Sequence, residues 1–254
     1  MKGFLFILAA LCLVMSSFSA YAANSKGDVK MPKKVLFVVT SHGELGDTGK
    51  PTGYFLSEVT HPWSEVSKEF EIDVVSPKGG KPPVTGFDLN DLINRKYWED
   101  KAWQAKMDHT LTPAQVNPDD YAAIYYAGGH GAMWDLPGNR EIAAIAEKIY
   151  KNGGVVAAVC HGPAGLVNLK REDGKYLVDG KKFDCFTNEE ETLNGSQDIV
   201  PFMLQSRLQE RGGVFDGAKP WSDHVVVDGR LVTGQNPQSA LALGKKLVET
   251  INRQ

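Results

Sequence analysis

The sequence predicts an α/β domain built on a mostly parallel sheet with helices on both faces. Short apolar runs alternate with longer stretches in which apolar residues recur at helical spacing, and this alternation is typical of successive strand–helix units. The chain has 254 residues, without an internal repeat, a low-complexity segment or a clear domain boundary. This length is enough for one large α/β domain with a substantial core.

The first half of the chain supplies two strands, one helix and an inserted segment. Residues 34–40 (KVLFVVT) predict a buried strand, and residues 41–52 a polar, glycine-rich loop. Residues 53–70 have the apolar spacing of a helix, which Pro62 is expected to kink. A second strand, a Gly/Pro-rich connection and a helical insertion follow at residues 71–76, 78–85 and 88–116. We expect a small core or a lid from the aromatic residues of the insertion, Tyr97, Trp98 and Trp103.

The second half repeats the strand–helix alternation. Residues 121–127 (YAAIYYA) predict a third strand, which ends in a glycine-rich turn, and residues 139–151 predict a helix. The Asp179-Gly180 and Asp228-Gly229 pairs each predict a hairpin turn. These hairpins are expected within residues 170–186 and between residues 224–228 and 230–233, and amphipathic helices at residues 197–211 and 238–251.

The N-terminal residues have the pattern of a secretory signal peptide. A basic start precedes an apolar stretch and the small-residue site Ala20-Tyr21-Ala22, which predicts a signal peptide over residues 1–22 and one domain over residues 23–254. The apolar stretch is too short to favour a membrane anchor. We therefore expect export across the inner membrane to the periplasm, with no membrane span in the mature form.

Charge and cysteine content limit the possible partners. The formal net charge is -3 and no basic stretch is present, so the sequence does not indicate nucleic-acid binding. Without the leader, Cys160 and Cys185 are the remaining cysteines. They could form a disulfide in an oxidising compartment, but a nucleophile must stay free to react, and we expect Cys160 to be free.

Residues 154–165 (GVVAAVCHGPAG) have the pattern of a nucleophile elbow. An apolar strand leads directly into Cys160, and His161, Gly162 and Pro163 follow. In a nucleophile elbow, a sharp turn of this kind between a strand and a helix exposes the reactive side chain. The free N–H groups of such a helix start are expected to lower the thiol pKa. The alternative is a buried core cysteine.

Other candidate site residues follow neighbouring strands or lie on the first helix. The turn from Gly128 to Gly131 lets the backbone come close to a reacting group, so the N–H groups of Gly129 and His161 predict an oxyanion hole. A catalytic histidine needs a carboxylate to orient it. The spacing does not show which of Glu189, Glu190 and Glu191 supplies this carboxylate. In the simplest interpretation, at least two of them lie in a solvated loop.

Four motifs in this order resemble the ThiJ/PfpI superfamily, and the resemblance covers essentially the whole mature chain. They are closest to the branch of glutathione-independent glyoxalases (glyoxalase III) and stress chaperones. The motifs are GGHGAMWDLP at residues 128–137, AVCHGPA at 158–164, FTNEEET at 186–192 and LVTGQNPQSA at 231–240. The resemblance implies a flavodoxin-like, class I glutamine-amidotransferase-like fold, a homodimer, and a helical cap formed by residues 88–116.

The resemblance also implies roles for individual residues. Cys160 matches the elbow cysteine of the family, and Glu58 the glutamate that hydrogen-bonds it. His161 and Glu191 match the histidine and the acid of the triad, while Gly129 and His161 match the oxyanion donors. No metal and no organic cofactor is expected.

These residues predict an enzyme acting on a small 2-oxoaldehyde, converting methylglyoxal to lactate. A holdase chaperone for unfolded proteins is one alternative. A thiol amidase or peptidase with the same site is another, and a redox sensor in which Glu58 holds an oxidised Cys160 is a third.

Other polar residues receive lesser roles. His130 is a candidate for lining the pocket, and His224 is expected to be structural. Turn or cap positions that brace the site are predicted at Asp135 and Asn236-Pro237. The remaining histidines lack the neighbours of a metal site: His42, His61 and His109.

Overall fold

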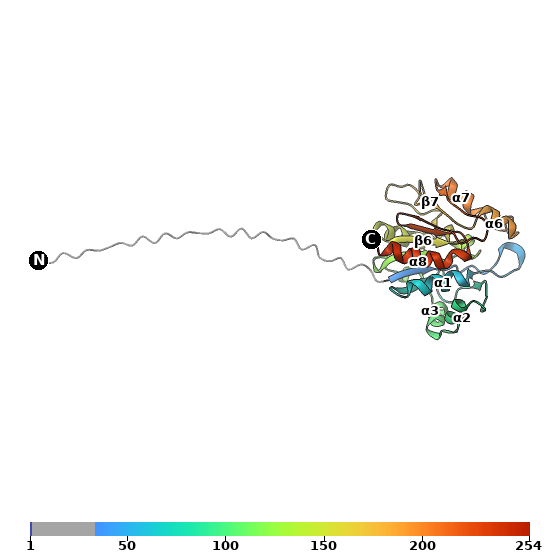
Figure 1. Ribbon diagram of the computed structural model, residues 1–254, viewed down its shortest axis with the longest axis horizontal. Coiled ribbons are helices and arrows are strands. Elements are labelled where there is room, and N and C mark those ends of the chain that lie inside the picture. The colour runs from blue at the N-terminus through green and yellow to red at the C-terminus, as the bar shows by residue number, and fades with distance from the viewer. Residues whose placement is uncertain (2–33) are drawn as a thin grey trace. The chain divides into compact units, whose positions relative to one another are not determined.

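The computed structural model describes Met1 and residues 34–254 (Figure 1). The predicted signal peptide and its cleavage site lie outside these residues, apart from Met1. Within residues 34–254, no helix combines the length and the apolar character needed to cross a bilayer.

A six-stranded sheet organises the described residues, in the order β3-β1-β5-β6-β10-β9. Neighbouring strands are parallel except β9 and β10, which pair antiparallel. The predicted mostly parallel sheet and the hairpin at Asp228-Gly229 are therefore confirmed. The strands are β1 (Lys34–Val38), β3 (Glu71–Val75), β5 (Tyr121–Tyr126), β6 (Val155–Val159), β9 (Val225–Asp228) and β10 (Leu231–Gly234).

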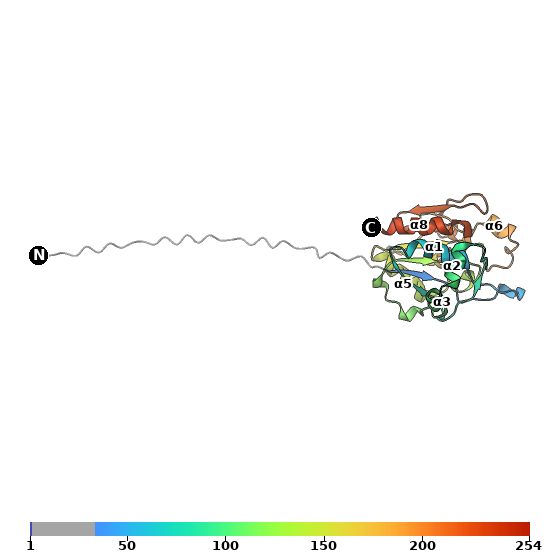
Figure 2. The same cartoon turned by 60° about the horizontal axis from the view of Figure 1, so that its bottom comes forward.

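Alternating side chains of the strands feed two cores, one on each face of the sheet. In β1, Leu36 and Val38 point to one core and Val35 and Phe37 to the other, as the period of two in a strand requires. The helices α5 (Arg140–Lys151) and α7 (Leu204–Glu210) cover the first core. The helices α1 (Leu56–Val66) and α8 (Ala240–Ile251) cover the second and lie side by side (Figures 1 and 2).

Close contact between α1 and α8 depends on Pro62 and Gly244. A Cβ on Gly244 would lie 2.7 Å from the Cα of Pro62, so only glycine permits this approach. Pro62 has no N–H and leaves the carbonyl of Glu58 without its helical partner. The hydroxyl of Tyr125, on β5, donates to that carbonyl at 2.5 Å. The helix continues through Pro62 as a single element, and it begins at Leu56 rather than at the predicted residue 53.

The residues before α1 form a short strand instead of a first helical turn. Tyr54–Phe55 (β2) pairs in parallel with Val84–Thr85 (β4). The amide of Phe55 also donates to the carbonyl of Gly128 at 3.1 Å. This pairing fixes the start of α1 against the turn that follows β5.

The predicted insertion forms two helices beside α1. Asp91 and Asp100 accept hydrogen bonds from backbone amides at the starts of α2 (Leu92–Glu99) and α3 (Lys101–Asp108). The buried rings of Tyr97 and Trp103 lie 6.3 and 6.2 Å from the ring of Trp63 on α1. The aromatic residues of the insertion thus build a small core against α1, one of the two roles predicted for them.

The region between β6 and β9 differs most from the prediction. No hairpin forms around Asp179-Gly180: Lys182–Phe183 (β7) instead pairs in parallel with Val214–Phe215 (β8). The predicted helix over residues 197–211 is wrong in its first part, because α7 begins at Leu204, after Pro201. The acidic run belongs to α6 (Asn188–Leu193) rather than to a loop.

Short helical turns complete the described chain. Those near the site are α4 (Ala132–Asp135) and the 3-10 turns η4 (Gly162–Leu166) and η5 (Pro237–Ser239), and those elsewhere are η1 (Gly46–Thr48), η2 (Pro113–Gln115) and η3 (Pro118–Asp120).

Candidate active site

Cys160 occupies the predicted elbow at the end of β6. Its φ is +58°, a backbone conformation that residues other than glycine rarely adopt. Its amide donates to the carbonyl of Gly234 at 2.9 Å, and its carbonyl accepts from the amide of Phe186 at 2.8 Å. The strain of about 1–3 kcal/mol is thus borne by contacts on both sides of the residue. The helix after the elbow is the short η4 turn.

The thiol of Cys160 is buried beside Glu58. Cys160 is 3% exposed and Glu58 is wholly buried. Burial first, and the carboxyl group of Glu58 second, raise the pKa of the Cys160 thiol well above its ordinary value. The predicted lowering of this pKa is therefore wrong, because removal from water disfavours the thiolate. The resting residue carries a thiol proton.

Glu58 also carries a proton at neutral pH. Burial raises the pKa of its carboxyl group to about 8, against the opposing effects of the Cys160 thiol and the Gly128 amide. Neither carboxyl oxygen has a well-aligned hydrogen-bond partner among the described residues. A protonated carboxyl group beside a sulfur can act as a proton donor.

His161 joins the thiol to Glu191. The Cys160 thiol lies 3.3 Å from His161 Nδ1, and His161 Nε2 lies 2.8 Å from Glu191 Oε2. Burial, followed by the neighbouring His130, lowers the pKa of His161 to about 4. The imidazole is therefore neutral at pH 7, with its Nε2–H donated to Glu191 and its Nδ1 open to accept the thiol proton. This arrangement is that of a nucleophile with an oriented general base.

Glu191 holds two histidines. Its Oε1 accepts from His130 Nε2 at 2.9 Å and from the hydroxyl of Ser196, and the rings of His130 and His161 are 4.0 Å apart. Although burial opposes ionisation, both histidines lower the pKa of Glu191 below its ordinary value. His130, Glu191 and His161 have ligand atoms within 4.8 Å of one another, and the hydrogen bonds among them account for this grouping.

The acidic run separates into three environments. Glu191 and Glu190 are buried, while Glu189 is exposed. The carboxylate of Glu190 accepts from the Thr187 amide at 2.9 Å, and the Glu190 amide donates to the Thr187 hydroxyl at 3.0 Å, which forms a capping box at the start of α6. The simplest interpretation of the sequence, with at least two glutamates in a solvated loop, is therefore wrong.

The glycine turn after β5 brings the backbone amide of Gly129 against Cys160. The amide of Gly129, at φ +96°, interacts with Cys160. A Cβ at Gly129 would lie 2.2 Å from the carbonyl oxygen of Gly53, and a Cβ at Gly128 would lie 2.7 Å from the amide nitrogen of His161. Only glycine fits these positions, and the turn places the Gly129 amide, one of the two predicted oxyanion donors, beside Cys160.

A cavity of about 540 Å³ opens onto this group, lined by Cys160, His161, His130 and Gly129. Other residues of its wall were not identified as site residues from the sequence. They come from α1, the insertion, and the segments after β4, β7 and β8, and they include His61, Phe87, Asp91, Phe186 and Trp221.

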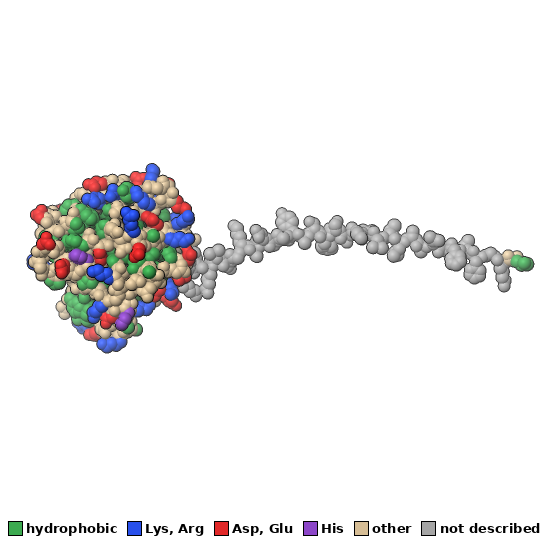
Figure 3. Space-filling model, turned by 180° about the vertical axis from the view of Figure 1, so that it is seen from behind, with side chains coloured by type: hydrophobic (Ala, Val, Ile, Leu, Met, Phe, Trp, Pro, Cys, Tyr) green, Lys and Arg blue, Asp and Glu red, His purple; other side chains and the backbone are tan. Residues whose placement is uncertain are grey.

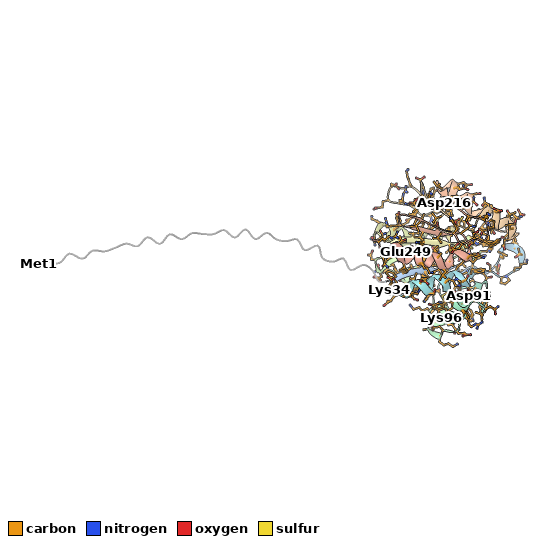
Figure 4. The ribbon with its side chains drawn as sticks, viewed as in Figure 1. Met1, Lys34, Asp91, Lys96, Asp216 and Glu249 are labelled. Carbon is orange, nitrogen blue, oxygen red and sulfur yellow. The ribbon has the colours of Figure 1, made fainter. Side chains whose placement is uncertain are left out.

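His61 and Asp91 form a pair in the cavity wall. His61 Nε2 lies 3.0 Å from the Asp91 carboxylate, which also caps α2. Figure 4 labels Asp91 at the α2 end of the molecule. The position of His61 one helical turn after Glu58 was the available signal in the sequence, because residues three apart on a helix share a face.

The residues predicted to brace the site do so. Asp135 accepts hydrogen bonds from the Thr40 hydroxyl and the Ser41 amide, both at 2.7 Å. Asn236 caps η5 and donates to Glu190 at 2.8 Å. His224 Nδ1 lies 2.7 Å from the buried Asp184, in keeping with a structural role.

Cys160 and Cys185 are both free and buried. The thiol of Cys185 donates to the carbonyl of Phe186 at 3.4 Å.

On the surface of the molecule, acidic and basic side chains are interspersed over the face that Figure 3 shows.

Two named relatives are similar to this chain in sequence over most of their length. The glutathione-independent glyoxalase HSP31 of Saccharomyces cerevisiae is 36% identical over 240 residues, which cover 87% of this chain and 98% of the relative. Glyoxalase 3 of Candida albicans is 32% identical over 232 residues, or 85% of this chain and 97% of the relative.

Solved structures give the same result. Rapid Encystment Protein 24 kDa of Francisella tularensis matches with a TM-score of 0.83 at 38% identity, covering 86% of this chain and 99% of that chain. Glyoxalase III of Candida albicans matches with a TM-score of 0.80 at 30% identity, covering 87% and 98%. A model of the DJ-1/PfpI family matches residues 33–250, and the protein described here belongs to that family.

Proposed function

We propose that this protein is a cysteine-dependent, glutathione-independent glyoxalase that converts methylglyoxal to lactate. The observation that carries the proposal is a thiol 3.3 Å from a neutral imidazole, which is itself 2.8 Å from a carboxylate. A small cavity opens onto the thiol. The glyoxalase names of the relatives from Saccharomyces cerevisiae and Candida albicans agree with this chemistry.

The first step joins the substrate to the enzyme. His161 Nδ1 takes the thiol proton as the Cys160 sulfur bonds to the aldehyde carbon, C1. The negative charge that develops on the aldehyde oxygen is stabilised by the amides of Gly129 and His161. The imidazolium returns its proton to this oxygen, which gives a hemithioacetal and a neutral His161.

The second step moves a hydrogen from C1 to C2. His161 removes the C1 proton to form an enediol, and the proton is delivered to C2, which leaves a 2-hydroxy thioester on Cys160. Glu58, which holds a proton below pH about 8, acts as the acid that neutralises charge on the substrate oxygens. Water then cleaves the thioester to lactate and the free thiol. No oxidant or reductant is consumed.

Lactate formation from methylglyoxal without glutathione tests the proposal. Cys160→Ala should abolish turnover. The matched control is Cys185→Ala, which removes the other buried free thiol and should leave turnover measurable. If Cys160→Ala makes as much lactate as the unaltered protein, the proposed function is wrong.

A holdase activity is a second candidate, favoured by exposed apolar side chains. Phe87, Leu92 and Leu193 are 51%, 74% and 62% exposed, and exposed apolar side chains can bind unfolded chains where they form a contiguous patch. This activity should suppress aggregation of a denatured client equally well in Cys160→Ala. Loss of suppression in that variant would contradict it.

Two further predictions accompany the proposal. We infer export to the periplasm from the signal-peptide pattern and a homodimer from the family resemblance. Fractionation of cells that produce the full chain tests the first, and light scattering of the mature protein tests the second.

A further inference from the structure

Trp221 holds a backbone conformation that a bulky residue rarely adopts. Its φ is +62°, and Cys160 is the other non-glycine residue with positive φ in the described part of the chain. Such backbone strain persists only where surrounding contacts impose it, and it is found most often at functional sites. The strained residue Cys160 lies in the wall of the catalytic cavity, so the strain at Trp221 calls for a comparable reason.

A buried carboxylate imposes this conformation. Glu190 is wholly buried, and its Oε1 accepts from the amide of Trp221 at 2.8 Å. The same oxygen accepts from Gln235 at 3.1 Å and from Asn236 at 2.8 Å. Glu190 therefore fixes the Trp221 backbone to α6 and to the turn after β10.

The indole lies in the wall of the cavity that holds Cys160. Trp221 is 41% exposed. Its ring packs against the edge of Phe186 at 5.5 Å, and the Phe186 ring lies 4.5 Å from the ring of His161. The three rings form a continuous wall from the catalytic histidine to solvent.

We propose that Trp221 and Phe186 bind the substituent R of the substrate R–CO–CHO, and that the protein prefers aromatic 2-oxoaldehydes such as phenylglyoxal to methylglyoxal. The inference rests on the proposed function. With C1 bonded to Cys160 and its oxygen on the amides, R is the part of the substrate that extends along the wall. A methyl group offers little surface to these rings, whereas a phenyl group packs well against aromatic edges and faces.

The reaction balances for the aromatic substrate as it does for methylglyoxal. A hydrogen moves from C1 to C2 and water cleaves the thioester, so that phenylglyoxal and water give mandelate. The chemistry at Cys160, His161 and Glu58 is unchanged, and only the binding of R differs.

Specificity constants for the two aldehydes test the proposal. The unaltered protein should favour phenylglyoxal in kcat/KM by about tenfold or more. Trp221→Ala should remove this preference, because kcat/KM should fall much further for phenylglyoxal than for methylglyoxal. Trp221→Phe, which keeps an aromatic ring, should retain most of the preference. An unchanged ratio in Trp221→Ala, or an equal fall for both aldehydes, would overturn the proposal.

A second variant separates binding from folding. Trp221→Gly adopts the same φ without strain and should unfold at a temperature close to that of the unaltered protein, yet lose the preference for phenylglyoxal. Retained preference in this variant would contradict a role for the ring.

Measuring how tightly the two product acids bind tests the aromatic wall separately from the proposed glyoxalase activity. Titration calorimetry should show mandelate binding more tightly than lactate to the unaltered protein, with this difference lost in Trp221→Ala. If neither aldehyde is turned over, the glyoxalase function fails while the calorimetry still decides on the aromatic wall. Equal binding of the two acids to the unaltered protein would overturn the inference.

Discussion

Glu58, beside the Cys160 thiol, and Glu191, bonded to His161, are both buried but differ in what surrounds them. Glu58, in the first turn of α1, is wholly buried and neither of its carboxyl oxygens has a well-aligned partner among the described residues. Burial raises its pKa to about 8. Glu191, on α6, is 1% exposed and is bonded to His161, His130 and Ser196. Its pKa is lowered although burial opposes the change.

This difference shows that partners, and not depth alone, decide the charge of a buried carboxyl group. Hydrogen bonds and nearby positive charge favour the ionised form, and their absence favours the protonated form. The two residues are therefore suited to opposite tasks, a proton donor at Glu58 and an orienting anion at Glu191. Separated pKa values of this kind distinguish acid from base in other active sites.

The largest expected effect comes from removing the orienting anion. Glu191→Gln keeps the shape of the side chain but removes its charge and replaces one acceptor oxygen with an NH2 donor, so the two histidines can no longer both donate to it and the tautomer of His161 is no longer fixed. We expect kcat for methylglyoxal to fall by about 10²–10⁴-fold. Glu189→Gln, a change at an exposed neighbour on the same helix, is the matched control and should have little effect. Similar losses in both variants would contradict the assignment of Glu191.

Thermal unfolding across pH should show the two carboxyl groups acting in opposite directions. The raised pKa of Glu58 contributes stability that is fully present below its ordinary pKa of 4.5 and is lost as the pH rises through about 8. The lowered pKa of Glu191 contributes stability that is present above 4.5 and is lost as the pH falls below that value.

Each variant should flatten one side of the stability profile. Glu58→Gln should reduce the loss of unfolding free energy between pH 4.5 and 8, a change on the order of a few kcal/mol. Glu191→Gln should reduce the loss on the acid side. Parallel profiles for both variants and the unaltered protein would mean that these carboxyl groups are not perturbed.

His130 gives a smaller and more specific test. It is one of the causes that lower the pKa of His161 to about 4. His130→Gln retains a donor for Glu191 and removes this influence, so the pKa of His161 should rise towards its ordinary value of 6.5. The acid limb of kcat/KM should move to higher pH, with activity at pH 8 within about tenfold of the unaltered protein. His109→Gln, at an exposed site on the insertion, should leave the limb in place.

The elbow and the glycine turn of this site could be predicted, because the residues that form them are adjacent in the sequence. The apolar run before Cys160 predicted the elbow, and the glycines at 128 and 129 predicted a turn with close backbone contacts. Both features are present in the structure. The choice of Glu191 came from the family resemblance. Whether Glu189, Glu190 or Glu191 is buried depends on the direction in which α6 packs, which spacing alone does not determine.

The features that were missed depend on contacts between distant segments. The thiol pKa was misjudged because the fold buries Cys160 and, second, places Glu58 beside it, and these effects outweigh that of the short η4 turn. The His61–Asp91 pair depends on how the insertion docks on α1. The place of Trp221 depends on Glu190 reaching across from α6. The spacing of His61 one helical turn after Glu58 is a periodic signal for His61 alone; its pairing with Asp91 and the other contacts leave no such signal in the sequence.

The pH dependence of kcat/KM for methylglyoxal in Glu58→Gln tests the central claim, that Glu58 is a protonated acid beside the thiol. For the unaltered protein, kcat/KM should fall as the pH rises through about 8, because Glu58 loses its proton there. Glu58→Gln should be slower by about 10²-fold or more and should lack this alkaline limb. Glu65→Gln, on the same helix, should keep it. An alkaline limb that persists unchanged in Glu58→Gln would contradict the account.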